Sequence, residues 1–128
     1  MEEIYLKILA LYFICKDVHY LALQKRRWDI HKQTDKIADN LIEWLDEIQE
    51  KHFIPVKRSF LYSAEIFKKL EGENKPSDLD KGLDVIKKHI VELLNLITKI
   101  VNDETIGSAN LISGFAESLQ QKLAFVGG

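Results

Sequence analysis

The chain has 128 residues, enough for a hydrophobic core, and we expect residues 1–128 to form a single domain. Hydrophobic residues make up 46% and charged residues 30%, as in ordinary globular proteins, and the net charge of −2 gives no sign of the basic footprint of a nucleic-acid-binding domain. The single cysteine, Cys15, excludes a disulfide framework, and the lack of a basic leader or of a ~18-residue apolar run predicts a cytoplasmic protein.

Two amphipathic helices are predicted in the first half of the chain. The first runs from Glu2 to Leu23 or Gln24, and its core stripe is Ile4, Ile8, Leu11, Cys15, Val18 and Ala22. A polar break at Gln24–Trp28 follows, and Asp29 is expected to cap the second helix, which runs to about His52. The core stripe of the second helix is Ile30, Ile37, Leu41, Trp44 or Leu45, and Ile48.

A long connection follows the second helix. Pro55 is expected to end that helix and to start a short one over Val56–Leu70, before a polar loop at Glu71–Ser77. Ser77 or Asp78 then caps a third long helix, and a turn at Asn102–Gly107 separates it from the last helix. The stripes of these two helices are Leu83, Ile86, Ile90, Leu93, Leu94, Ile97 and Val101, and Ala109, Ile112, Phe115, Leu119, Leu123 and Val126.

These elements predict an all-α protein, an antiparallel bundle of four long helices. The long connection between the second and third long helices, with its short extra helix, is the variation expected in ferritin-like bundles.

Five side chains near the start of the chain are of the nitrogen and oxygen types that iron accepts: His19, His31, Asp35, Asp46 and Glu50. His31 and Asp35 are four residues apart, as are Asp46 and Glu50, so each pair shares one helical face. Eleven residues separate Asp35 from Asp46, which puts both pairs on nearly the same face but roughly 16 Å apart. Two copies packed antiparallel about a two-fold axis would place His31 and Asp35 of one chain opposite Asp46 and Glu50 of the other.

Each pair also has a simpler interpretation. A helical His–Asp pair is usually a solvent-facing hydrogen bond, and an acidic pair at this spacing is usually plain helix surface, where like charges repel slightly. His52 and His89 lie outside the pattern and are interpreted as surface or core histidines. Trp44 lies on a core stripe, so we expect it to pack, whereas Trp28 could quench radicals near iron.

The order and spacing of the five residues resemble the ferroxidase pattern of the Dps family of mini-ferritins. The surrounding segments HYLALQKRRWDIH, LIEWLDEIQE and SLQQKLAFVGG are similar to family segments along nearly the whole chain. Tyr20 stands where the family usually has Trp, Ala124 stands where an aromatic residue is common, and Asn110 stands where Asp is often found.

The resemblance implies an iron-oxidising, iron-storing protein that protects against oxidative damage. It implies a shell of twelve subunits, with iron sites at two-fold interfaces built from His19, His31 and Asp35 of one subunit and Asp46 and Glu50 of its partner. These five residues would be both the metal ligands and the catalytic residues for oxidation of Fe(II), commonly by hydrogen peroxide, and Fe(III) mineral would be stored inside. The resemblance also makes Asp103 and Glu104 candidates for an acidic iron-entry pore.

Two alternatives remain on the same fold: a non-catalytic helical assembly and a DNA-associated stress protein. Many Dps proteins bind DNA through lysine-rich tails, and we expect none here, because neither end of the sequence is rich in lysine and its one basic cluster is Lys25–Arg27. We therefore expect no appreciable binding of duplex DNA at physiological salt.

Overall fold

The structure is a computed structural model that describes residues 1–57 and 78–126. The helices are α1 (Glu2–Gln24), α2 (Trp28–Ile48), α4 (Leu79–Ile100) and α5 (Ile106–Phe125), with a π-helix η1 (Gln49–Lys57) after α2 and a short 3₁₀-helix η2 (Val101–Asp103) after α4. The described residues contain no strand, which confirms the all-α prediction in that part of the chain. No helix among them is both long enough and apolar enough to span a bilayer.

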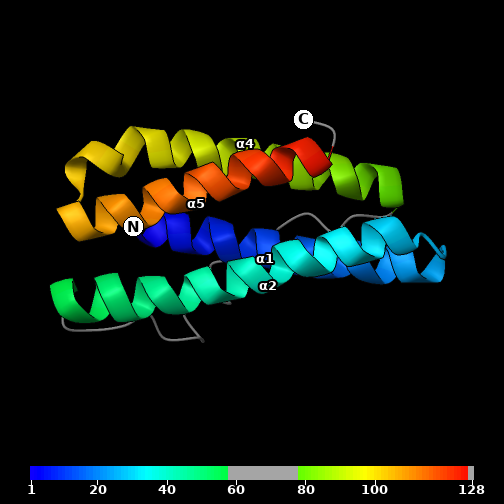
Figure 1. Ribbon diagram of the computed structural model, residues 1–128, viewed down its shortest axis with the longest axis horizontal. Helices are drawn as coiled ribbons and strands as arrows, with labels where there is room; N and C mark the ends of the chain where they lie inside the picture. Colours follow the sequence, from blue (N-terminus) through cyan, green and yellow to red (C-terminus); the bar gives the residue numbers. More distant parts are fainter. Residues whose placement is uncertain (58–77, 127–128) are drawn as a thin grey trace.

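The four long helices form a bundle in which each contacts two others. α1 packs against α2 and α4, and α5 packs against α4 and α2 (Figure 1). α1 is antiparallel to α2 and α4 is antiparallel to α5, whereas α2 and α4 run in the same direction (Figure 1). The chain therefore leaves α2 at one end of the bundle and enters α4 at the other end. This arrangement requires a long connection between the two helices.

The core lies between the stripes that the sequence predicts. All six predicted core residues of α1 are buried, as are Ile30, Ile37, Leu41, Trp44, Leu45 and Ile48 of α2. Most of the α4 and α5 stripes is also buried: Ile86, Ile90, Leu93, Ile97, Ile112, Phe115 and Leu119. The remaining stripe positions are partly buried: Leu83, Leu94, Val101, Ala109, Leu123 and Val126. Each fully buried aliphatic side chain contributes about 1.5–3 kcal/mol of transfer free energy, so these stripes supply most of the stabilisation.

The turn between α1 and α2 is a Schellman motif. The Arg27 amide donates to the Ala22 carbonyl at 2.8 Å and the Arg26 amide donates to the Leu23 carbonyl at 3.2 Å. Arg26 takes the left-handed conformation, with φ of 56°, at a position that usually carries glycine. The prediction that Asp29 caps α2 is wrong. The N-cap is Arg27, and the Asp29 carboxylate lies in the first turn, where it pairs with the Arg27 guanidinium at 3.4 Å.

The end of α2 also differs from the sequence expectation. The α-helix ends at Ile48, four residues before the expected end, and Pro55 lies inside the π-helix rather than ending the helical run. A proline ring clashes with the carbonyl four residues earlier in an α-helix, and a wider π turn relieves that clash. The short helix expected over Val56–Leu70 falls almost entirely outside the described residues.

Side-chain caps fix the starts of α4 and α5. Asp78, one of the two residues predicted, caps α4 by accepting from the Lys81 amide at 2.8 Å. Thr105 caps α5 by accepting from the Ser108 amide at 3.4 Å, so the turn before α5 ends two residues earlier than expected. These two side-chain caps stabilise the first turns of α4 and α5. The α1–α2 pair is held instead by the turn between its two helices.

Candidate metal centre

His19 and His31 lie next to each other near the α1–α2 turn. His19 is in the last turns of α1 and His31 is in the first turn of α2, so the tight turn brings them to the same level of the bundle. Their imidazole rings stack, with centroids 3.8 Å apart and an interplanar angle of 20°. His19 is buried and His31 is partly exposed, so the pair lies at the edge of the core.

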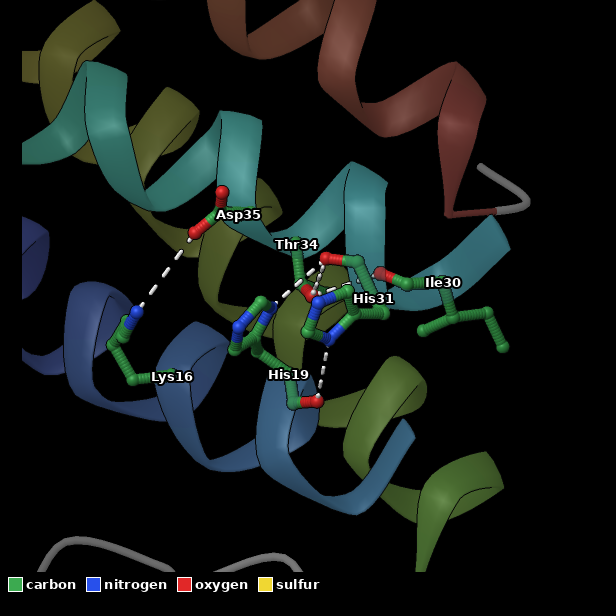
Figure 2. A network of polar contacts seen from close by, with 6 residues as sticks. All are labelled: Lys16, His19, Ile30, His31, Thr34 and Asp35. Carbon is green, nitrogen blue, oxygen red and sulfur yellow. Dashed lines mark hydrogen bonds and ion pairs between the residues drawn. The ribbon is translucent and has the colours of Figure 1, made fainter. Parts of the chain in front are cut away.

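Each ring contacts the main chain of the other residue. The Nδ1 atom of His19 lies 2.9 Å from the His31 carbonyl oxygen, and the Nδ1 atom of His31 lies 3.4 Å from the His19 carbonyl oxygen (Figure 2). Because a carbonyl oxygen can only accept, Nδ1 carries the proton in each contact, and a neutral ring then keeps its lone pair at Nε2. Metal-binding histidines are commonly oriented by this kind of backbone contact at the second nitrogen.

Buried and aromatic neighbours hold this arrangement in place. The Thr34 hydroxyl donates to the Ile30 carbonyl at 2.8 Å and to the His31 carbonyl at 3.2 Å, which fixes the first turn of α2. The Trp28 ring meets His31 edge-on with centroids 6.0 Å apart, and the Tyr20 ring meets His19 edge-on at 5.5 Å. Both aromatic side chains are about half exposed, so they border the site on its solvent side.

Asp35 lies one turn along α2 from His31, as the spacing of four residues predicts. Its carboxylate is 49% exposed, and Oδ1 lies 3.8 Å from the Lys16 ammonium of α1 (Figure 2). Lys16 is three residues before His19, and its ammonium lies over the Tyr20 ring at 5.4 Å from the centroid. Sequence reasoning did not single out Lys16, although a lysine three residues before a candidate ligand shares its helical face.

Asp46 and Glu50 lie away from the histidines, toward the other end of α2, and both are exposed. Asp46 is in the last turn of the α-helix, whereas Glu50 is already in the π-helix. The wider winding at Glu50 means that the α-helical spacing rule does not fix how the two carboxylates face each other. Their separation from His31 within one chain agrees with the argument that one subunit cannot use both pairs in a single site.

No cluster of three or more His, Cys, Asp or Glu side chains that could hold a metal occurs within the part of the chain that is described. The structure brings together two of the five candidate residues, His19 and His31, whereas the Asp35 carboxylate, one turn along α2, faces Lys16 (Figure 2). Completion of the site by Asp46 and Glu50 of a second copy stays a prediction.

Other candidates from the sequence lie in different surroundings. His52 and His89 are both buried, in agreement with a core role, and the His52 Nδ1 atom lies 2.7 Å from the Ser108 hydroxyl oxygen. Glu104, a pore candidate, lies 3.9 Å from His52 Nδ1 and 3.7 Å from the Met1 amino group, whereas Asp103 is exposed. Glu104 is therefore engaged in contacts within its own subunit.

A second polar group lies inside the bundle. Lys122 is buried, and its ammonium donates to the Asn40 side-chain oxygen at 2.7 Å and to the Ser118 hydroxyl at 2.8 Å. It also lies 5.5 Å from the Trp44 ring centroid, and Trp44 stacks on Phe115 with centroids 4.5 Å apart. Burial lowers the pKa of Lys122. Trp44 thus packs in the core, as predicted.

Cys15 lies one turn before His19 on α1 and is fully buried. Burial raises the pKa of the Cys15 thiol to about 12, although the nearby Lys122 ammonium acts in the opposite direction. The thiolate is the reactive form of cysteine toward oxidants, so the thiol next to the candidate centre is inert at neutral pH.

In comparisons with known proteins, the chain matches no protein-family profile, no curated protein and no solved structure. What distinguishes this chain is the five-residue pattern together with the stacked imidazoles of His19 and His31.

Proposed function

We propose that this chain is a subunit of an iron-oxidising, iron-storing mini-ferritin of the Dps type. The observation that carries the proposal is the His19–His31 pair. Its Nδ1-to-carbonyl contacts favour the tautomer that presents Nε2 lone pairs, and the Asp35 carboxylate lies one turn away. Two imidazoles and a carboxylate are a set of ligands suited to Fe(II).

The ligand set is completed by a second subunit. Asp46 near the end of α2 and Glu50 in η1 are both exposed and available to a partner, and Asp46 lies about three turns beyond Asp35. An antiparallel pair of α2 helices about a two-fold axis would present them to His31 and Asp35 of the neighbour, and would form two equivalent sites at each interface. Twelve subunits would then assemble into a closed shell.

The topology supports the ferritin-like part of the proposal. Two antiparallel helix pairs are joined by a long connection, since α2 and α4 run in the same direction (Figure 1). This is the connectivity of ferritin-like bundles, and it differs from an up-down-up-down bundle with short loops.

Iron is the substrate in this proposal. Hydrogen peroxide accepts two electrons, one from each of two Fe(II) ions, so the reaction consumes both reactants that together generate hydroxyl radicals. The carboxylates bind iron in both oxidation states, and the imidazoles add ligands without adding negative charge. The inert Cys15 thiol suits a protein that handles peroxide, because no thiolate competes for the oxidant.

The test is Fe(II) oxidation by a variant that lacks the distal carboxylates. Asp46→Ala with Glu50→Ala should abolish rapid oxidation by peroxide while the assembly remains largely intact, because both side chains are exposed and neither packs in the core. The rate is followed by the absorbance of Fe(III) after Fe(II) and peroxide are mixed, and the assembly by native mass.

A matched control is Asp80→Ala with Asp84→Ala. Asp80 and Asp84 are exposed carboxylates of α4 with the same four-residue spacing as Asp46 and Glu50. Their substitution removes two negative charges, as the test variant does. Oxidation should continue at the wild-type rate in the control. Wild-type rates in both variants would show that Asp46 and Glu50 are ordinary surface residues. A wild-type protein that assembles but oxidises Fe(II) no faster than free solution would favour a non-catalytic helical assembly instead.

A further inference from the structure

The strongest feature that the proposed function does not use is the contact of Lys16 with a candidate ligand. The Lys16 ammonium lies 3.8 Å from Oδ1 of Asp35, which makes it the cation closest to that carboxylate among the described residues. Lys16 belongs to α1 and Asp35 to α2, so the contact bridges the two helices that carry the histidines (Figure 2).

Lys16 is held in this position from a second side. Its ammonium lies over the Tyr20 ring, 5.4 Å from the centroid, and Tyr20 in turn meets the His19 ring edge-on. Lys16, His19 and Tyr20 are three and four residues apart, so they share one face of α1. The positive charge is thus kept beside Asp35, on the face of α1 that also carries His19.

We infer that Lys16 is a placeholder for the metal substrate: its ammonium occupies Asp35 while the site is empty and is displaced when a divalent cation binds. The inference rests on the proposed function and names a residue that regulates the same site. A divalent cation and an ammonium cannot both lie against one carboxylate without repulsion, so binding requires Lys16 to swing away.

The contact is suited to a site that fills and empties. The Lys16 side chain is 26% exposed and the Asp35 side chain 49% exposed, and at 3.8 Å the contact is an ion pair without a hydrogen bond. Such an exposed pair is weak and easily broken, so Lys16 lowers the affinity for the cation without blocking it. A site that passes iron on to a mineral store benefits from moderate affinity.

The test uses Zn(II), a redox-inert probe, in calorimetric titrations of the full chain at one fixed pH and salt concentration. Lys16→Met keeps the apolar stem but removes the charge, and should bind Zn(II) about three- to fivefold more tightly than the wild type. Lys16→Arg keeps the charge and should bind no more tightly than the wild type. Lys32→Met removes an exposed lysine of α2 and controls for the general loss of positive charge; its affinity should change by less than about twofold.

The competing interpretation predicts the opposite sign. If Lys16 positions Asp35 for binding, Lys16→Met would bind Zn(II) more weakly than the wild type, and this result would overturn the inference, as would equal affinities for Lys16→Met and Lys32→Met. A separate double variant, His19→Ala with His31→Ala, tests whether Zn(II) binds at the proposed site at all. If that variant binds Zn(II) as tightly as the wild type, the proposed site is wrong and the inference falls with it.

Discussion

The buried thiol of Cys15 makes the alkaline stability of this protein predictable. Folding raises the pKa of Cys15 from its ordinary value of 9.0 to about 12, because the side chain is removed from water. A group whose folded pKa is raised contributes stability that is fully present below pH 9.0 and is lost as the pH rises toward 12. The unfolded chain releases the thiol proton in this window and the folded chain retains it.

The magnitude follows from the size of the shift. Each pH unit above the unfolded pKa costs about 1.4 kcal/mol of folding free energy, so at about pH 10.5 the wild type loses roughly 2 kcal/mol through Cys15 alone. Cys15→Ala removes this loss. Lys122, whose lowered pKa acts in the opposite direction over part of the same range, is present in both proteins, so its contribution largely cancels in the comparison.

The measurement is urea unfolding, followed by circular dichroism, at pH 7 and at about pH 10.5 under reducing conditions. Wild type should lose about 2 kcal/mol more than Cys15→Ala between the two pH values. Val18→Ala changes a buried, non-titrating side chain on the same helix. It should be less stable than the wild type by the same free energy at both pH values. Equal losses for the wild type and Cys15→Ala would refute the reasoning and show that the thiol titrates normally in the folded protein.

Two further predictions concern the helix ends. Arg26→Gly should raise stability by about 1 kcal/mol, because glycine adopts the left-handed conformation without the steric cost of a Cβ atom, and thermal unfolding should show a gain that Arg27→Gly does not share. Asp78→Ala should lower stability by about 1 kcal/mol through loss of the α4 cap, whereas Asp78→Asn should retain most of the stability that the cap provides. An Ala variant as stable as the wild type would show that the cap contributes nothing.

The positions of the long helices could be predicted because they depend on near neighbours. Apolar residues three and four apart define a helical face before any partner is known, and the predicted stripes of α1 and α2 are indeed buried. The Asp78 cap was likewise predictable, since a capping side chain bonds to an amide three residues along the same chain. The same local rule placed His31 and Asp35 on neighbouring turns of one helix.

Other features depend on how α1 packs against α2 and could not be read from either helix alone. The Schellman turn with Arg26 in the left-handed conformation sets the register of the two helices, and that register brings each imidazole to the other residue's carbonyl group. No spacing rule within one helix specifies which nitrogen of His19 is protonated, because that depends on an acceptor twelve residues away.

The same reasoning explains the residues that the sequence did not reveal. Lys16 is recognised only when α2 places Asp35 beside it, and Lys122 looks like a surface lysine until Asn40 and Trp44 close around it. Side-chain type and helical period are enough to specify which faces of the helices are apolar and which side chains are of the kinds that iron accepts. The packing of one helix on another decided which of these groups meet, since contacts between distant residues depend on the turn geometry that joins their helices.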